Sequence, residues 1–346
     1  MKKFTRLFLL FIIPLLYTGC SKEELISING STMGTTYSIK LTSFPGASLT
    51  TVFIKSEVDS VLKEVNRQMS TYIPDSEISR FNSSSDTSWF DISADFANVV
   101  KAALKISEVS GGAFDITVEP LVNLWGFGPE KEAGEIPSED EISARKALTG
   151  YHKLHVDTAN NRIKKDIPGL QIDLSAIAKG FGVDKVSLFL ESHGFINYMV
   201  EIGGEVRTKG NPVSDSVWKI GISTPDNNFG IQKVLRLNDM SVATSGDYRN
   251  YFEKDGLRYS HTINPISGRP ITHNLASVTV LHKSCMLADG YATAISVIGT
   301  EKAMAFADKA GLEIFLLKKV DDKFVEEQTG GMNSYLVVYD DSKEEN

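Results

Sequence analysis

The sequence has no block of basic residues, no Walker lysine motif and no GxGxxG segment that joins a strand to a helix. Its formal net charge is −8, so it lacks the electrostatic pattern of a nucleic-acid-binding protein. The missing glycine motifs argue against a P-loop and a Rossmann-type nucleotide site. The overall composition is that of a globular protein, because 346 residues with 42% hydrophobic and 23% charged can bury a sizeable core.

The N-terminal apolar run is too short to cross a bilayer, which takes about 20 apolar residues. Lys2, Lys3 and Arg6 precede an apolar run over 7–17, and Gly19-Cys20 follows. This order predicts a signal peptide. It resembles a bacterial lipoprotein signal, in which the cysteine carries acyl chains, palmitate among them. The alternative for Cys20 is a small buried side chain.

The resemblance implies an exported protein anchored through Cys20 to the periplasmic face of the inner membrane or to the outer membrane. We expect a signal peptide over 1–19, a polar tether over 20–28 and one domain over 29–346. Loss of the three positive charges changes the net charge from −8 to −11. Cys285 is then the only cysteine beside the lipidated one, so the domain depends on its core rather than on a disulfide.

Hydrophobic periodicity predicts an α+β fold without a regular βαβ rhythm or a repeat. We expect one compact unit with a cleft between two lobes. A loop and a short helix are expected over 69–82, and a hairpin over 151–169. The remaining expected helices cover 58–69, 94–110, 175–193, 285–299 and 302–311, and the remaining expected strands cover 35–41, 171–174, 197–203, 218–223, 241–246, 277–281, 313–319 and 334–340.

Asp289 and Thr293 are the first candidate pair for chemistry. They stand four residues apart on a predicted helix, so their side chains share one face. A carboxylate and a hydroxyl are hard oxygen ligands of the kind that Mg²⁺ accepts. The structural alternative is a helix-terminal charge and a surface hydroxyl.

DLSAIAKGFGVD (173–184) and GGAFDITVEP (111–120) are two further candidate segments. In the first, free N–H groups at a helix start and Lys179 would favour an anion, although Asp173 can equally be a cap and Lys179 a solvated charge. The second combines flexible glycines with Phe114 and Asp115, which suits close approach to a flat heterocycle. Phe114 can equally be a core residue.

Histidines give a weaker signal than these segments. His261 lies in HTINPISGRP, where it can be a catalytic group or a packed residue. His152 and His155 alternate on a predicted strand without nearby acidic or cysteine ligands, so the sequence does not predict a zinc site.

Together these segments resemble the ApbE family of FAD:protein FMN transferases in order and spacing, over nearly all of the expected domain. The residues that carry the resemblance lie in STMGTTYSIKL, MSTYIPDSEISRFN, GGAFDITVEPLVNLWGFG, DLSAIAKGFGVD, VEIGGEVRTKG, HTINPISGRP and LADGYATA. The resemblance implies an ApbE-like fold, a magnesium site at Ala176, Asp289 and Thr293, and His261 and Asp289 as catalytic residues. It implies FAD contacts at Met33, Tyr72, Ala113, Phe114, Asp115, Asp173, Lys179 and Ile263.

The reaction implied by the resemblance is Mg²⁺-dependent transfer of the FMN part of FAD to a threonine of another protein, with release of AMP. Acceptors in this family carry a Ser/Thr-Gly-Ala-Thr type segment, typically in membrane redox pumps and related exported flavoproteins. This chain has no Gly-Ala-Thr, so it is not expected to be its own acceptor. Two alternatives stay open: an FAD pyrophosphatase that gives FMN and AMP, and a lipoprotein that only binds FAD.

Overall fold

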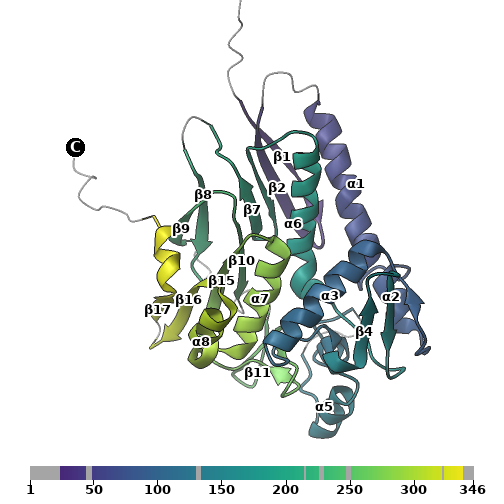
Figure 1. The fold of residues 1–346 in the computed structure, drawn as a ribbon. Helices are drawn as coiled ribbons and strands as arrows, with labels where there is room; N and C mark the ends of the chain where they lie inside the picture. The colour runs from purple at the N-terminus through teal and green to yellow at the C-terminus, as the bar shows by residue number, and fades with distance from the viewer. Residues whose placement is uncertain are drawn as a thin grey trace, which may run out of the picture.

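An eight-stranded antiparallel sheet forms the centre of the protein (Figure 1). The computed structural model describes residues 24–43, 49–129, 134–213, 216–225, 230–246, 251–321 and 323–337. Along the sheet the strands are β1 (Leu25–Thr32), β2 (Thr35–Thr42), β6 (Tyr198–Ile202), β7 (Glu205–Lys209), β10 (Ser241–Gly246), β15 (Leu275–His282), β16 (Glu313–Val320) and β17 (Lys323–Gln328).

Four helices pack against one face of this sheet: α1 (Thr51–Met69), α6 (Ser175–Ser192), α7 (Cys285–Ile298) and α8 (Thr300–Ala310). The helix α1 shows why these segments dock. It buries Ile54, Val58, Leu62 and Val65, which recur at helical spacing and form a single apolar stripe. On the sheet, Ile314 and Leu316 face the helices, while Phe315 and Leu317 face the other way.

The opposite face is covered by the hairpin of β8 (Trp218–Ser223) and β9 (Ile231–Leu237) and by the 3-10 helix η3 (Gly330–Ser334). Leu235 and Leu237 from β9 and Met332 from η3 pack there against Phe315 and Leu317. The sheet is therefore buried on both faces around β7, β10, β15 and β16, whereas β1 exposes alternate residues.

A second group of elements lies beside the ends of α1 and α6 (Figure 1). It comprises α2 (Glu77–Ser83), α3 (Ala94–Val109), the 3-10 helices η1 (Ile116–Val118) and η2 (Tyr151–Lys153), α4 (Glu119–Leu124), α5 (Glu139–Lys146), and a sheet of β3 (Phe90–Asp91), β5 (Arg162–Lys165) and β4 (Leu154–Asp157). Two short hairpins complete the described elements: β11 (Tyr251–Lys254) with β12 (Leu257–Ser260), and β13 (Ile263–Asn264) with β14 (Arg269–Pro270).

Helix α6 joins the two groups. Ile177, Ala178 and Phe181 belong to the core around α3 and β5, whereas Val186 and Leu190 belong to the core between α1 and the central sheet. Apolar residues therefore surround the helix, as expected of a buried one. The predicted α+β class and the single compact unit are confirmed.

The predicted strand over 171–174 is wrong, because the hydrogen bonds described for this segment run to helical elements rather than to a neighbouring strand. The Ile172 N–H donates to Asn82 Oδ1 and the Asp173 N–H donates to the Ile116 carbonyl. The predicted strand over 334–340 is also wrong in its described part. Ser334 ends η3 and Leu336 makes an isolated bridge to Leu235, while 338–340 lie outside the described residues.

Two smaller differences concern β4 and the N-terminal segment. His152 lies in η2, so only His155 is on the strand β4. Strand β1 begins at Leu25, inside the segment expected to be a tether, and residues 1–23, including Cys20, lie outside the described part. Among the described residues, no helix combines the length and the apolar character needed to cross a membrane.

Candidate active site

The candidate site lies where α6 and α7 approach each other closely at Gly180. An ideal Cβ at Gly180 would stand 2.3 Å from the Cys285 carbonyl oxygen and 2.8 Å from Asp289 Cβ. A larger residue would therefore push the two helices apart. On α7, Gly290 meets the side chains of Ile106 and Ile177.

Asp289 is buried at this contact, with 4% of its surface exposed. Its Oδ2 accepts a hydrogen bond of 2.9 Å from the Gly180 N–H of α6. In a regular helix that N–H pairs with the carbonyl of Ala176, four residues earlier. Asp289 therefore contacts the same Gly180 N–H group that would pair with the Ala176 carbonyl in a regular helix. Burial raises the pKa of Asp289, against the lowering effect of Lys179 and the Gly180 N–H.

Lys179 places an ammonium between two buried carboxylates. Its Nζ lies 3.2 Å from Glu205 Oε1 and 3.8 Å from Asp289 Oδ1. Burial opposes the charge of Lys179, but the carboxylates of Asp289 and Glu205 outweigh it and raise its pKa above the ordinary value. Burial raises the pKa of Glu205, and the Lys179 ammonium opposes that rise.

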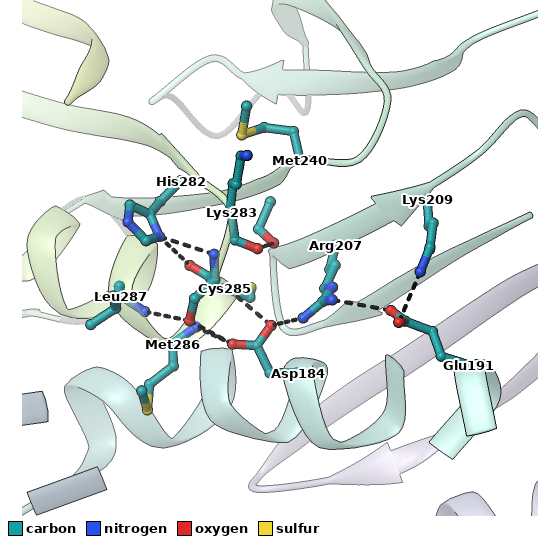
Figure 2. Close-up of polar contacts among 12 residues, drawn as sticks. Asp184, Glu191, Arg207, Lys209, Met240, His282, Lys283, Cys285, Met286 and Leu287 are labelled. Carbon is teal, nitrogen blue, oxygen red and sulfur yellow. Dashed lines mark hydrogen bonds and ion pairs between the residues drawn. The ribbon is translucent and has the colours of Figure 1, made fainter. Parts of the chain in front are cut away.

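The first turn of α7 is fixed by Asp184, which projects from α6 (Figure 2). Asp184 accepts hydrogen bonds from the Ser284 hydroxyl at 2.7 Å and from the N–H groups of Cys285 and Met286 at 3.1 Å each. These are N–H groups that a helix start leaves without an intrahelical partner. Arg207 of β7 donates to the same carboxylate at 2.8 Å and so ties the sheet to both helices.

Asp173 stands two residues before the first residue of α6. It accepts hydrogen bonds from the Ser175 N–H and the Ser175 hydroxyl, each at 2.8 Å. Burial raises the pKa of Asp173. The N-cap of α6 is Leu174, without a side-chain cap hydrogen bond, so the N-cap role considered for Asp173 is not the one observed; Ala176 lies in the first turn of the helix.

Met33 reaches α6 from the tight turn between β1 and β2. Met33 and Gly34 both have positive φ, 50° and 70°, and Thr32 pairs with Thr35, so the two strands are joined by a two-residue turn. Positive φ is unusual for methionine. The turn directs the side chain onto the helix, where Met33 Cε lies 3.0 Å from an ideal Cβ at Gly182. Met33 also borders a groove between this turn and α1 that includes Lys55, Asp59 and Asn66.

Tyr72 is 71% exposed in the loop before α2. Partial burial and then the nearby carboxylates of Asp173 and Glu119 raise its pKa. Its phenol therefore lies near the start of α6. An exposed aromatic ring there offers a flat apolar surface, as expected for a residue that contacts a ligand.

Ala113, Phe114 and Asp115 follow α3, and they differ in what they contact. Phe114 is a core residue, as the structural alternative held. Asp115 is 8% exposed and accepts hydrogen bonds from the Thr117 N–H, the Thr117 hydroxyl and the Tyr151 N–H, while burial raises its pKa. Ala113 packs with Ile271 and with Val297 of α7.

His261 and Ile263 stand between β12 and β14. Ile263 is buried in a cluster with Leu121 and Trp125 of the α4 region. The His261 ring meets the ring of Phe127 edge-on, with 6.4 Å between their centroids. The adjoining Thr262 carbonyl accepts a hydrogen bond from the Ile271 N–H, and Ile271 in turn packs on Ala113. The segment is thereby linked to the loop after α3 and to α7.

The residues predicted to hold Mg²⁺ fit a hard divalent cation. Thr293, on α7 with Asp289, makes no hydrogen bond through its hydroxyl within the part of the chain that the structure describes. Glu205 Oε2 is buried without a hydrogen-bond partner, and two carboxylates face one ammonium. Among the described residues no group of three His, Cys, Asp or Glu side chains could hold a metal, so such a site must draw on hydroxyl and carbonyl oxygens.

Three positions at this site received no role from the sequence. Glu205 lies in VEIGGEVRTKG, a segment that supported the resemblance without an assigned residue. Asp184 ends DLSAIAKGFGVD, and Gly180 follows Lys179 within it. Only the fold brings Gly180 and Asp184 against α7 and Glu205 against Lys179.

The fold and the site together define an α+β protein with a candidate cation site between two helices and a lysine beside it. A family model described as the ApbE family matches residues 33–316, and the chain belongs to this family.

The similar proteins found by sequence and by structure are named as flavin transferases. A FAD:protein FMN transferase of Vibrio cholerae serotype O1 is 47% identical over 324 residues, which cover 93% of this chain and 96% of the relative. The solved structure of the flavin transferase ApbE from Vibrio cholerae matches with a TM-score of 0.84 and 45% identity, over 91% of this chain and 100% of that one. The apo form of the flavinyl transferase ApbE from Pseudomonas stutzeri matches with a TM-score of 0.84 and 40% identity, over 90% of this chain and 97% of that one.

Proposed function

We propose that this protein is an FAD:protein FMN transferase, which attaches the FMN part of FAD to a threonine of an acceptor protein and releases AMP. Its membership of the ApbE family and the names of its relatives support this function. The observation that carries the proposal is the meeting of Asp289, Lys179 and the Gly180 N–H at the crossing of α6 and α7.

Asp289, Thr293 and the Ala176 carbonyl would hold Mg²⁺. When bound there, the ion would neutralise charge on the pyrophosphate of FAD and stabilise the charge that develops in transfer. Lys179 would bind a phosphate oxygen beside it. Met33, Tyr72, Ala113, Phe114, Asp115, Asp173 and Ile263 would border the FAD, although the packing of Phe114 and the three hydrogen bonds of Asp115 favour support over direct contact for these two.

In the reaction the threonine oxygen forms a bond to the FMN-side phosphorus, and the bond from that phosphorus to the bridging oxygen breaks. The bridging oxygen leaves with AMP, and the threonine proton passes to a base. A carboxylate that ligates Mg²⁺ stays ionised and is a weak base, so His261 is favoured over Asp289 for this proton.

The location and the acceptor are part of the same proposal. The N-terminal sequence supports export and a lipid anchor at Cys20, on the periplasmic face of the inner membrane or on the outer membrane. An acceptor with a Ser/Thr-Gly-Ala-Thr type segment, such as a membrane redox pump subunit, would then meet the enzyme outside the cytoplasm.

The test mixes purified protein, FAD, Mg²⁺ and an acceptor domain and follows the fluorescent flavin band on a denaturing gel. We expect Asp289→Ala to abolish the band and Asp289→Glu to retain part of it, since a hard oxygen ligand is what the ion needs. Asp308→Ala is the control, because Asp308 is exposed on α8.

The two alternatives give other results in the same assay. FMN and AMP without a labelled acceptor would favour a pyrophosphatase, and bound FAD that stays intact with Mg²⁺ would favour a carrier. Full labelling by Asp289→Ala at low Mg²⁺ would refute the metal assignment and the mechanism built on it.

A further inference from the structure

Glu205 is the buried carboxylate that the proposed reaction does not use. It begins β7 directly after the Gly203-Gly204 turn, and 3% of its surface is exposed. Its Oε1 lies 3.2 Å from Lys179 Nζ, and its Oε2 has no hydrogen-bond partner. A buried carboxylate oxygen without a partner is costly, so Glu205 at this position calls for a physical reason.

The position of Lys179 supplies that reason. Its ammonium is nearer to Glu205 than to Asp289, at 3.2 Å against 3.8 Å. The second distance is at the outer limit of an ion pair and too long for a hydrogen bond. The stem of Lys179 runs beside Gly203, since its Cδ lies 3.4 Å from an ideal Cβ there. The Lys179 ammonium therefore lies near Asp289 without a direct hydrogen bond to it.

A direct salt bridge from Lys179 to Asp289 would compete with a cation. Asp289 already has Oδ2 occupied by the Gly180 N–H, so Oδ1 is its freer oxygen. An ammonium that closed on Oδ1 would occupy the oxygen that a metal needs, and the two cations would repel each other. Without Glu205, Asp289 is the remaining carboxylate within 4.0 Å of Lys179 Nζ among the described residues.

We propose that Glu205 is a positioning residue that draws the Lys179 ammonium away from Asp289 Oδ1 and so keeps this oxygen open for a divalent cation. This inference rests on the proposed magnesium site. It assigns a role to the VEIGGEVRTKG segment, and it makes Glu205 a determinant of metal affinity without contact to the metal.

The first experiment titrates the folded protein with Mg²⁺ alone, without FAD, and measures the dissociation constant by calorimetry. We expect Glu205→Gln, which keeps the size of the side chain, to weaken Mg²⁺ binding about 10- to 100-fold, as changes behind a metal ligand typically do. Glu201→Gln is the matched control. Glu201 lies in the same β6–β7 hairpin and accepts a hydrogen bond from the Gly204 N–H, so its variant should bind Mg²⁺ like the parent.

The second experiment repeats the titration in a Lys179→Met background, because loss of a negative charge near the site could weaken binding by itself. Lys179→Met removes the competing ammonium, so we expect it to bind Mg²⁺ at least as tightly as the parent. Adding Glu205→Gln to it should then change the dissociation constant less than threefold. The difference between the two backgrounds is the coupling of Glu205 through Lys179.

The outcomes separate this inference from the proposed function. If the parent protein binds no Mg²⁺ and Asp289→Ala behaves alike, both proposals fail. If the parent binds Mg²⁺ through Asp289 but Glu205→Gln binds equally well, only this inference fails. If Glu205→Gln weakens Mg²⁺ binding as much in the Lys179→Met background as in the parent, Glu205 acts on the ion directly. That result would overturn the positioning role. Thermal unfolding in EDTA checks that each variant is folded. If Glu205→Gln fails to fold, the Lys179→Met variant alone tests the inference, and weaker Mg²⁺ binding by this variant would refute it.

Discussion

Gly180→Ala tests whether the close approach of α6 and α7 creates the site. The added methyl group would stand 2.3 Å from the Cys285 carbonyl oxygen and 2.7 Å from its carbon. Both are backbone atoms of the first turn of α7, which Asp184 holds through two N–H groups and the Ser284 hydroxyl. Because Asp184 lies on α6, any movement of this turn away from Gly180 separates the helices and strains those bonds.

Two opposing effects set the magnitude of the change. Alanine is favoured over glycine inside a helix by about 1 kcal/mol. Overpacking a well-filled contact costs about 1–3 kcal/mol. The free energy of unfolding should therefore fall by up to about 2 kcal/mol. Separation of the helices should also lengthen the 2.9 Å hydrogen bond from the Gly180 N–H to Asp289, which weakens Mg²⁺ binding as well.

The assay is urea unfolding together with Mg²⁺ titration, and Gly182→Ala is the matched control. Gly182 lies on the same helix, but its added methyl group would meet the flexible ends of Met33 and Ile202, at 3.0 and 3.3 Å. We expect the control to keep the parent's metal affinity and to be no less stable than the parent. Equal stability and equal Mg²⁺ affinity in Gly180→Ala would refute the reasoning.

Three further predictions concern the proposed metal ligand Thr293, a buried lysine and the proposed lipid anchor. Thr293→Val should lose FMN transfer and regain part of it at high Mg²⁺, because mass action offsets weaker binding of the ion. The measurement is the transfer rate against Mg²⁺ concentration. A loss that no Mg²⁺ concentration restores would contradict this prediction. Lys165 is fully buried, and burial lowers its pKa from 10.5 to about 8. The unfolded chain then binds more protons between these values, so the free energy of unfolding should rise by at most about 3 kcal/mol from pH 8 to 10.5. Lys165→Met should remove that rise in urea unfolding, and an unchanged slope would exclude Lys165 as its source. Cys20→Ser should release the protein from the membrane fraction, and firm retention would place the anchor elsewhere.

Much of the fold could be predicted because its helices and strands carry their own periodicity. Helix α1 buries every third or fourth residue, and β16 alternates between the two faces of the sheet. The segment over 171–174 misled the prediction because an apolar run that bonds to helical elements looks like a strand in sequence. Its partners Asn82 and Ile116 are remote along the chain, so no local signal marks them.

The candidate site could be predicted where the residue type alone indicates the chemistry. It could not be predicted where the role of a residue depends on its burial. Asp289 and Lys179 stand in recognisable segments. Glu205 and Asp184 look like ordinary solvated charges on a strand and a helix, since a buried acid and an exposed acid read alike in sequence. Their roles depend on Lys179, Arg207 and the start of α7, which only the folded chain brings together.

The two buried carboxylates near Lys179 differ in ways that fit different tasks. Asp289 shares its helix face with Thr293, and its contact with the Gly180 N–H places it beside the turn that contains the Ala176 carbonyl. Thr293 and the turn of Ala176 thus accompany Asp289, whereas Glu205 stands on β7 on the other side of Lys179, and its Oε2 has no hydrogen-bond partner among the described residues. A metal bound at Asp289 would leave room for water and phosphate oxygens as further ligands. A metal drawn to Glu205 would instead have to displace Lys179, the group proposed to bind the phosphate. The proposed metal ligand on α7 and the support for Lys179 on β7 would thus let both cations act on one pyrophosphate.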